Sequence, residues 1–97
     1  MSYGGVDINI YERQIKDANE AISANPRDAE SYYRRGTMYF RMDQQERAIQ
    51  DFDKAISLNP QHADAHSGRG ATYGSLDQHE RAIQDFDKAI SLNPQHA

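Results

Sequence analysis

The chain has 97 residues, 11 of them basic and 15 acidic, so its formal net charge is −4. This acidic balance argues against broad binding to nucleic-acid phosphates, and the absence of cysteine excludes disulfides, thiolate metal sites and a cysteine nucleophile. No apolar run approaches the ~20 residues of a membrane span and no secretory signal pattern opens the chain, so we expect one cytoplasmic domain that binds neither nucleic acid nor membrane.

Residues 1–8, MSYGGVDI, come before the first helical pattern. Val6, Ile8 and Ile10 alternate as in a strand, but the stretch is too short to predict one. We expect a flexible leader at this position. The alternative is that the leader docks on an exposed apolar surface of its own chain or of a neighbour.

A period of 34 residues organises the rest of the chain. Residues 43–62 match residues 77–96 at 19 of 20 positions, and residues 9–26 match residues 43–60 at 9 of 18. A fixed period of this length indicates stacked supersecondary units. The chain therefore contains two full repeats and the second half of an earlier one.

The second helix of each repeat is predicted by an apolar stripe at helical spacing. In residues 46–58 the stripe consists of Ala48, Ile49, Phe52, Ala55 and Ile56. The Asn-Pro pair at residues 59–60 ends this helix, because proline disfavours a helical conformation in the residue before it. The same pair recurs at residues 25–26 and 93–94.

The helix starts are predicted from a capping pattern. Asp43 and Glu46 have the spacing at which a short side chain accepts from a free backbone N–H and the glutamate reaches back. The pattern recurs with Asn9 and Glu12, and with Asp77 and Glu80.

The pattern predicts an all-α chain of five helices, at residues 9–24, 29–42, 45–58, 63–76 and 79–92. They form one helical-repeat domain over residues 9–97, made of a half repeat (9–28), a repeat (29–62) and a repeat without a C-terminal capping helix (63–97). The last copy stops at a repeat boundary, which suggests a longer natural array.

Two glycines lie inside predicted first helices. Glycine costs about 1 kcal/mol against alanine in a helix interior, so a gain elsewhere is expected. We predict close backbone approach across each hairpin, between Gly36 and Ala48 and between Gly70 and Ala82.

These positions resemble the tetratricopeptide repeat family. The first full copy supplies the signature residues Tyr32, Gly36, Tyr39, Ala48, Phe52, Ala55 and Pro60, and the second supplies Gly70, Tyr73, Ala82, Phe86, Ala89 and Pro94. His66 departs from the large residue usual at its position, and Arg35 and Arg69 stand where the family usually has leucine, so a wetter hairpin interior is expected. The resemblance implies a right-handed α-solenoid of antiparallel helix pairs with about two and a half repeats.

The resemblance also implies a protein-interaction scaffold that binds an extended peptide of a partner along a concave groove lined by helices 29–42 and 63–76. Carried over by position, the groove residues are Glu30, Tyr33, Arg34, Thr37, Phe40, Arg41, Asp64, Ser67 and Ala71. Tyr33 and Phe40 are candidate anchors, and Arg34 or Arg41 is a candidate partner for an acidic group. Tyr33, Thr37 and Gly68 occupy the places where some family members clamp a terminal carboxylate with lysine and asparagine, so that clamp is not expected.

Other chemistry is not predicted. The sequence contains no nucleophile elbow and no glycine-rich phosphate loop, so we expect neither catalysis nor a cofactor. His62 and His66 are four residues apart, but no third metal ligand is evident, so no metal site is predicted.

A second hypothesis concerns the helix at residues 79–92. It repeats the apolar stripe of helix 45–58 without a following helix, and repeat arrays normally end in a capping element with a polar outer face. We therefore predict self-association through Ile83, Phe86, Ala89 and Ile90, with a two-fold dimer favoured over head-to-tail stacking on helix 9–24.

Overall fold

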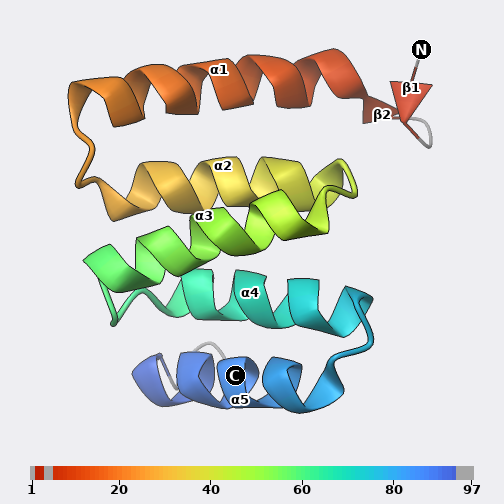
Figure 1. Cartoon of the computed structure of the whole chain (residues 1–97), viewed down its shortest axis with the longest axis vertical. Helices are drawn as coiled ribbons and strands as arrows, with labels where there is room; N and C mark the ends of the chain where they lie inside the picture. The colour runs from red at the N-terminus through yellow and green to blue at the C-terminus, as the bar shows by residue number, and fades with distance from the viewer. Residues whose placement is uncertain (1, 4–5, 94–97) are drawn as a thin grey trace.

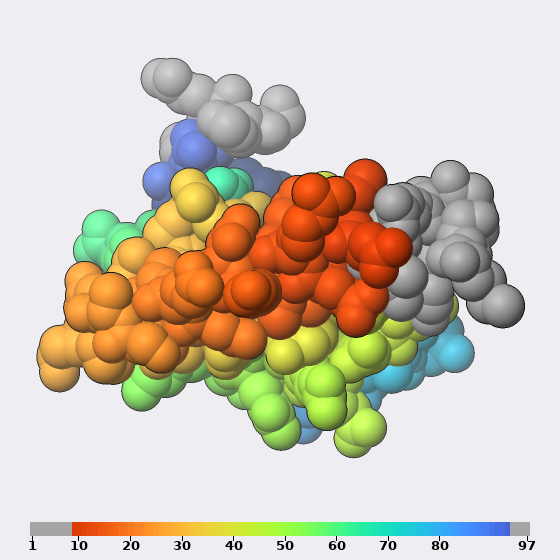
Figure 2. Space-filling model, turned by 90° about the horizontal axis from the view of Figure 1, so that it is seen from above, coloured from red at the N-terminus to blue at the C-terminus, as the bar shows by residue number. Residues whose placement is uncertain are grey.

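The computed structural model describes residues 2–3 and 6–93. These residues form five helices: α1 (Ile8–Ala24), α2 (Ala29–Arg41), α3 (Gln45–Leu58), α4 (Ala63–Ser75) and α5 (His79–Leu92). Consecutive helices run antiparallel and stack in chain order, so that α1 and α5 lie at opposite ends of the stack (Figure 1). Figure 2 looks onto the α1 end, with α1 in red and orange at the front. Every predicted helix is confirmed, with ends that differ from the prediction by at most one residue.

The segment before α1 contains a short antiparallel ladder. Strand β1 (Ser2–Tyr3) pairs with β2 (Val6–Asp7), with Ser2 opposite Asp7 and Tyr3 opposite Val6. The flexible leader predicted at residues 1–8 includes residues 1, 4 and 5, which lie outside the described residues, and α1 begins at Ile8. Across the described part of the chain, no helix is both long and apolar enough to cross a membrane.

Phe52 is the centre of the core. Its side chain is 1% exposed, and Ala48 and Ala55 on the same face of α3 are fully buried. A Cβ at Gly36 of α2 would lie 3.1 Å from the Phe52 ring and 3.2 Å from the Ala48 carbonyl oxygen, so the predicted close approach at Gly36 is confirmed.

The α4 side of the same ring is closer still. A Cβ at Gly68 would lie 2.7 Å from the end of the Phe52 ring. The ring therefore fits between two glycines, one from the helix before it and one from the helix after it.

The second hairpin also has the close approach predicted at its glycine. The three atoms nearest to a Cβ at Gly70 belong to Asp85 and Phe86, at 3.0–3.1 Å. Ala82, the predicted partner of Gly70, lies 3.9 Å from the Cβ position of Gly74, one turn further along α4. Gly70 thus makes room for the aromatic ring and for the aspartate.

The capping prediction was wrong at Asn9, which lies inside α1, and at Asp43 and Asp77. Both aspartates have positive φ, 61° and 60°, and the N-caps of α3 and α5 are Gln44 and Gln78, which make no side-chain capping bond. Asp43 instead closes α2: its N–H donates to the Phe40 carbonyl at 3.0 Å.

The N–H of Gln44 donates to the Tyr39 carbonyl at 2.8 Å. This pair of bonds is the Schellman motif, which places a left-handed residue, usually glycine, just after a helix. The same two bonds recur at Asp77 and Gln78, to Gly74 and Tyr73.

Replacing Asp43 or Asp77 with glycine is therefore expected to raise the free energy of unfolding by about 0.5–1 kcal/mol per site, because a side chain in the left-handed region is strained. Urea denaturation followed by circular dichroism measures the change. Asp28→Gly is the matched control: Asp28 has φ −87° and accepts the Glu30 N–H and the Ser31 hydroxyl, so its loss should lower stability. A loss of stability in Asp43→Gly would contradict the assignment.

Equivalent positions of the two repeats make the same hydrogen bonds with different residue types. Asp28 caps α2, and His62, 34 positions later, caps α4 by accepting the Ala65 N–H on Nδ1 at 3.0 Å. The Tyr32 hydroxyl donates to the Pro26 carbonyl at 3.0 Å, and in the second repeat Nε2 of His66 makes the corresponding 3.0 Å bond to the Pro60 carbonyl. The departure from the family pattern at His66 therefore preserves a hydrogen bond.

The two arginines in place of leucine hold the helices together. The Arg35 guanidinium donates two bonds to the Asp51 carboxylate, both 2.8 Å, and a third to the Asn19 side chain at 2.9 Å. The paired Asp51 is only 5% exposed. A single residue of α2 thus joins α1, α2 and α3.

Arg69 repeats the arrangement in the second repeat. It donates two bonds to Asp85 at 2.8 and 2.9 Å and one to Asp53 at 2.9 Å. Hydrogen bonding to Asp85 raises the pKa of Arg69, and partial burial opposes this. A wetter hairpin interior was expected from the sequence. The structure shows two buried carboxylates there, Asp51 and Asp85, each of which accepts two hydrogen bonds from an arginine.

Candidate functional site

The sequence predicts a groove along α2 and α4, and these two helices contact each other although α3 separates them in sequence. All nine predicted groove residues are on these two helices, and none of them is buried. On α2 all of them except Thr37 are aromatic or charged, whereas on α4 Ser67 and Ala71 are small and Asp64 is charged. The two helices therefore present different side chains at the predicted positions.

Tyr33 contacts two neighbouring rings. Its ring centroid is 6.0 Å from that of Phe52 and 5.0 Å from that of His62, and it is tilted against both. The ring is thus held by the core on one side and by the cap of α4 on the other, while part of it stays accessible.

Glu30 connects the starts of α2 and α4. Its carboxylate lies 2.9 Å from Nε2 of His62 and 3.4 Å from Nε of Arg34. Because Nδ1 of His62 accepts the Ala65 N–H, the imidazole proton is on Nε2 and is donated to Glu30. His62 contacts the predicted groove residues Glu30 and Tyr33 but was not predicted with them, and its only signal was its equivalence to the capping Asp28.

The remaining polar residues of the groove are less constrained. The Thr37 hydroxyl donates to the Tyr33 carbonyl at 3.0 Å, whereas Arg41 and Asp64 are exposed. Arg34 is also mostly exposed, at 72% of its side chain. Phe40 is half-buried at the other end of α2 and leaves an apolar surface next to Arg41.

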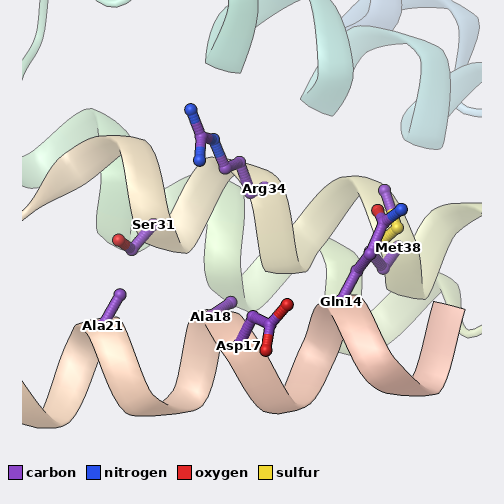
Figure 3. A pocket seen from close by; sticks show the side chains of 7 residues that line it. All are labelled: Gln14, Asp17, Ala18, Ala21, Ser31, Arg34 and Met38. Atoms are coloured by element: carbon purple, nitrogen blue, oxygen red, sulfur yellow. The ribbon is translucent and has the colours of Figure 1, made fainter.

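A pocket of about 400 Å³ lies between α1 and α2. Its walls are Gln14, Asp17, Ala18 and Ala21 from α1, and Ser31, Arg34 and Met38 from α2. Figure 3 shows Ala18 and Ala21 directed from α1 towards α2, while the Arg34 guanidinium points away from α1. Apart from Arg34, none of these residues was a predicted site residue.

The outer face of α5 is apolar and open. Ile83, Phe86 and Ile90 are 58%, 39% and 49% exposed, whereas Phe52, which is the counterpart of Phe86, is 1% exposed beneath α4. Ala89 was predicted to belong to this face, but it is only 7% exposed and is not available to a partner. The open surface, named here the α5 face, therefore consists of the three large side chains.

The two histidines considered as a metal pair are engaged elsewhere, His62 with Glu30 and His66 with the Pro60 carbonyl. Within residues 9–93 there is no group of three or more histidine, aspartate or glutamate side chains arranged to hold a metal ion.

Comparisons with known proteins agree with this architecture. The first tetratricopeptide repeat domain of Spaghetti (RPAP3), solved bound to the HSP90 peptide SRMEEVD, is 28% identical and superposes with a TM-score of 0.85 over 89% of this chain and 68% of that one. The Arabidopsis OM64 tetratricopeptide repeat domain is 28% identical, with a TM-score of 0.86 over 90% of this chain and 72% of that one.

MamA is 33% identical, with a TM-score of 0.82 over 91% of this chain, and this chain spans about half, 52%, of the MamA chain. No curated protein matches in sequence. The sequence profile of the tetratricopeptide repeat matches residues 29–62 and 63–96. The chain belongs to the tetratricopeptide repeat family.

Proposed function

We propose that this protein is a protein-interaction scaffold that binds an extended segment of a partner in the groove between α2 and α4. The observation that carries the proposal is the contrast between two contacting helices: α2 has accessible aromatic and basic residues, and α4 has small ones. Small residues let a peptide backbone approach closely, and rigid aromatic rings supply contact area at little entropic cost. A structural neighbour of this chain has been solved with a bound peptide.

The groove favours a segment with an apolar side chain and an acidic one. Tyr33 and Phe40 provide the apolar contacts. Arg41 is exposed and has no ion-pair partner among residues 9–93, so its guanidinium is free for a bidentate bond to a carboxylate. Arg34 already pairs with Glu30 and contributes less.

A second candidate function is self-assembly through the α5 face. Ile83, Phe86 and Ile90 form an apolar strip on one side of α5, and covering it against a second copy would remove apolar surface from water. A two-fold dimer is the simplest closed arrangement.

One set of variants separates the two functions. Peptides selected from a random library against the purified chain provide the ligand, and the double variant Phe40→Ala, Arg41→Ala should weaken their binding about 30-fold, as expected for loss of a hot spot of ~2 kcal/mol. Ile83→Glu with Ile90→Glu should leave peptide binding unchanged and should dissociate any dimer seen by analytical ultracentrifugation. Gln50→Ala, an exposed change on α3, is the matched control.

Selected peptides that bind the Phe40→Ala, Arg41→Ala variant as tightly as the parent chain would contradict the groove proposal. A parent chain that remains monomeric at high micromolar concentration would contradict self-assembly. Circular dichroism of each variant shows whether the fold is retained.

A further inference from the structure

The pocket between α1 and α2 corresponds, one repeat earlier, to the filled core between α3 and α4. Each of its lining residues has a counterpart 34 positions later. Five of these counterparts, Ala48, Phe52, Ala55, Ala65 and Thr72, are at most 1% exposed. The space between α3 and α4 corresponds to the pocket between α1 and α2, and α2 covers it by packing against both α3 and α4. No described helix covers the space between α1 and α2 in the same way, so the pocket there remains open.

The acidic residue of the pocket, Asp17, can be compared with its equivalents in the later repeats. Asp17, Asp51 and Asp85 are equivalent positions in three successive second helices. Asp51 and Asp85 each receive two hydrogen bonds from an arginine of the preceding helix, Arg35 or Arg69, at 2.8–2.9 Å. Asp17 is exposed and has no hydrogen-bond or ion-pair partner among residues 9–93.

We propose that this pocket is a binding site for an arginine carried on a helix of a partner polypeptide, with the Asp17 carboxylate accepting the two N–H bonds that Asp51 accepts from Arg35. The site is distinct from the α2–α4 groove and does not depend on the function proposed for it. Bidentate arginine–carboxylate pairs are directional as well as strong, so Asp17 would fix the register of the bound helix while Ala18, Ala21 and Met38 receive its apolar side.

The residues around the pocket constrain the sequence of the bound helix. Arg35 and Arg69 are each followed by glycine, because a Cβ at Gly36 or Gly70 would lie within 3.0–3.2 Å of the helix beneath. The bound helix therefore needs a small residue directly after its arginine. Ala18 replaces the phenylalanine found in α3 and α5, which leaves room in this pocket for one larger apolar side chain.

A second copy of the chain is a less suitable occupant, because its arginines that precede a glycine or an alanine already have partners within their own chain. Arg35 and Arg69 are already committed to their own aspartates, and Arg47 and Arg81 lie over Tyr39 and Tyr73 at about 5.5 Å. Insertion of Arg35 or Arg69 from a second copy would require one of its hairpins to open. The partner is therefore a separate amphipathic helix with an Arg-Gly or Arg-Ala step.

The chain itself supplies the probe. A fluorescein-labelled peptide with the sequence of residues 29–42, AESYYRRGTMYFRM, is titrated with the full 97-residue protein and followed by fluorescence anisotropy. Saturable binding is expected below about 1 mM. Replacing Arg35 with alanine in the peptide, or Asp17 with asparagine in the protein, should weaken binding at least about tenfold, because each change removes one half of a charge-assisted pair.

Three controls make the result specific. Glu20→Gln removes an exposed acid of α1 that does not line the pocket, and it should not change the affinity. Combining Asp17→Arg in the protein with Arg35→Asp in the peptide should restore binding that either change alone abolishes. The groove variant Phe40→Ala, Arg41→Ala should bind the probe normally, which separates this site from the proposed peptide groove.

Absence of saturable binding would overturn the proposal, and so would an equal loss from Glu20→Gln and Asp17→Asn. Self-association of the chain in analytical ultracentrifugation that Asp17→Asn abolishes would show instead that a second copy occupies the pocket, and it would overturn the proposal. Amide shifts of ¹⁵N-labelled protein should be confined to the residues around Gln14, Asp17 and Ala21, and shifts centred on α4 would also contradict the assignment.

Discussion

Replacing Phe52 with alanine is expected to lower the free energy of unfolding by about 3–5 kcal/mol, whereas Phe86→Ala should cost only about 1–2 kcal/mol. The two residues lie in segments of identical sequence, residues 46–58 and 80–92. The difference comes from their neighbours: Phe52 is covered by α2 through Gly36 and by α4 through Gly68. Phe86, in contrast, is covered by α4 through Gly70, and no described helix covers its outer side. Water fills the space left at Phe86, but at Phe52 a closed cavity remains.

Urea denaturation followed by far-ultraviolet circular dichroism measures both changes in the same buffer. If Phe52→Ala is unfolded in buffer, trimethylamine oxide added equally to all proteins restores a measurable transition, because excluded osmolytes strengthen burial. Equal losses at the two sites would show that the surroundings of the two rings do not differ as described.

Replacing Arg35 with leucine, the residue usual in the family, is expected to lower the free energy of unfolding by about 2–4 kcal/mol, because it leaves the Asp51 carboxylate buried without its partner. The third bond, to Asn19, is lost as well. The double variant Arg35→Leu, Asp51→Ala removes both charges and should recover most of the loss. Gln84→Ala, at an exposed position of α5, is the control.

The double variant distinguishes a charge effect from a packing effect. If it is no more stable than Arg35→Leu alone, the arginine acts through the packing of its aliphatic part and not through the pair. Hydrogen bonding to Asp51 raises the pKa of Arg35 above its ordinary value, although burial opposes this. The arginine therefore contributes fully below its unfolded-state pKa, and this contribution is lost only in strong alkali, as the pH rises through the folded-state pKa.

The helices could be predicted because period, apolar stripes and proline all agree on them. The capping error has a physical origin. Asp43 is compatible both with starting α3 and with closing α2, since aspartate tolerates a left-handed conformation as well as an N-cap. Asp43 caps α3 if that helix begins one residue earlier, and it closes α2 if α3 begins at Gln45, as it does here. Sequence spacing does not distinguish these two starts.

The groove residues could be placed on two helix faces by repeat position, but their contacts depend on residues that are distant in sequence. His62 is positioned by Glu30, 32 residues away, and by Tyr33 across the groove. The pocket between α1 and α2 was missed because a cavity is a property of packed helices. Its signal was nevertheless present in the alignment of the chain on itself, where Asp17 aligns with two aspartates whose arginines are visible only in three dimensions.

The fit between Phe52 and Gly68 has a consequence for how such an array can lengthen. Residue 68 must be glycine because it lies on a phenylalanine, whereas Arg34 at the equivalent place follows Ala18 and needs no such space. Tandem copying of residues 63–96 would place Gly68 over Phe86 and give a compatible joint each time. Copying residues 29–62 behind α3 would place Arg34 over a phenylalanine and force the helices apart. The packing of Phe52 on Gly68 therefore permits an array extended by the second repeat and disfavours one extended by the first.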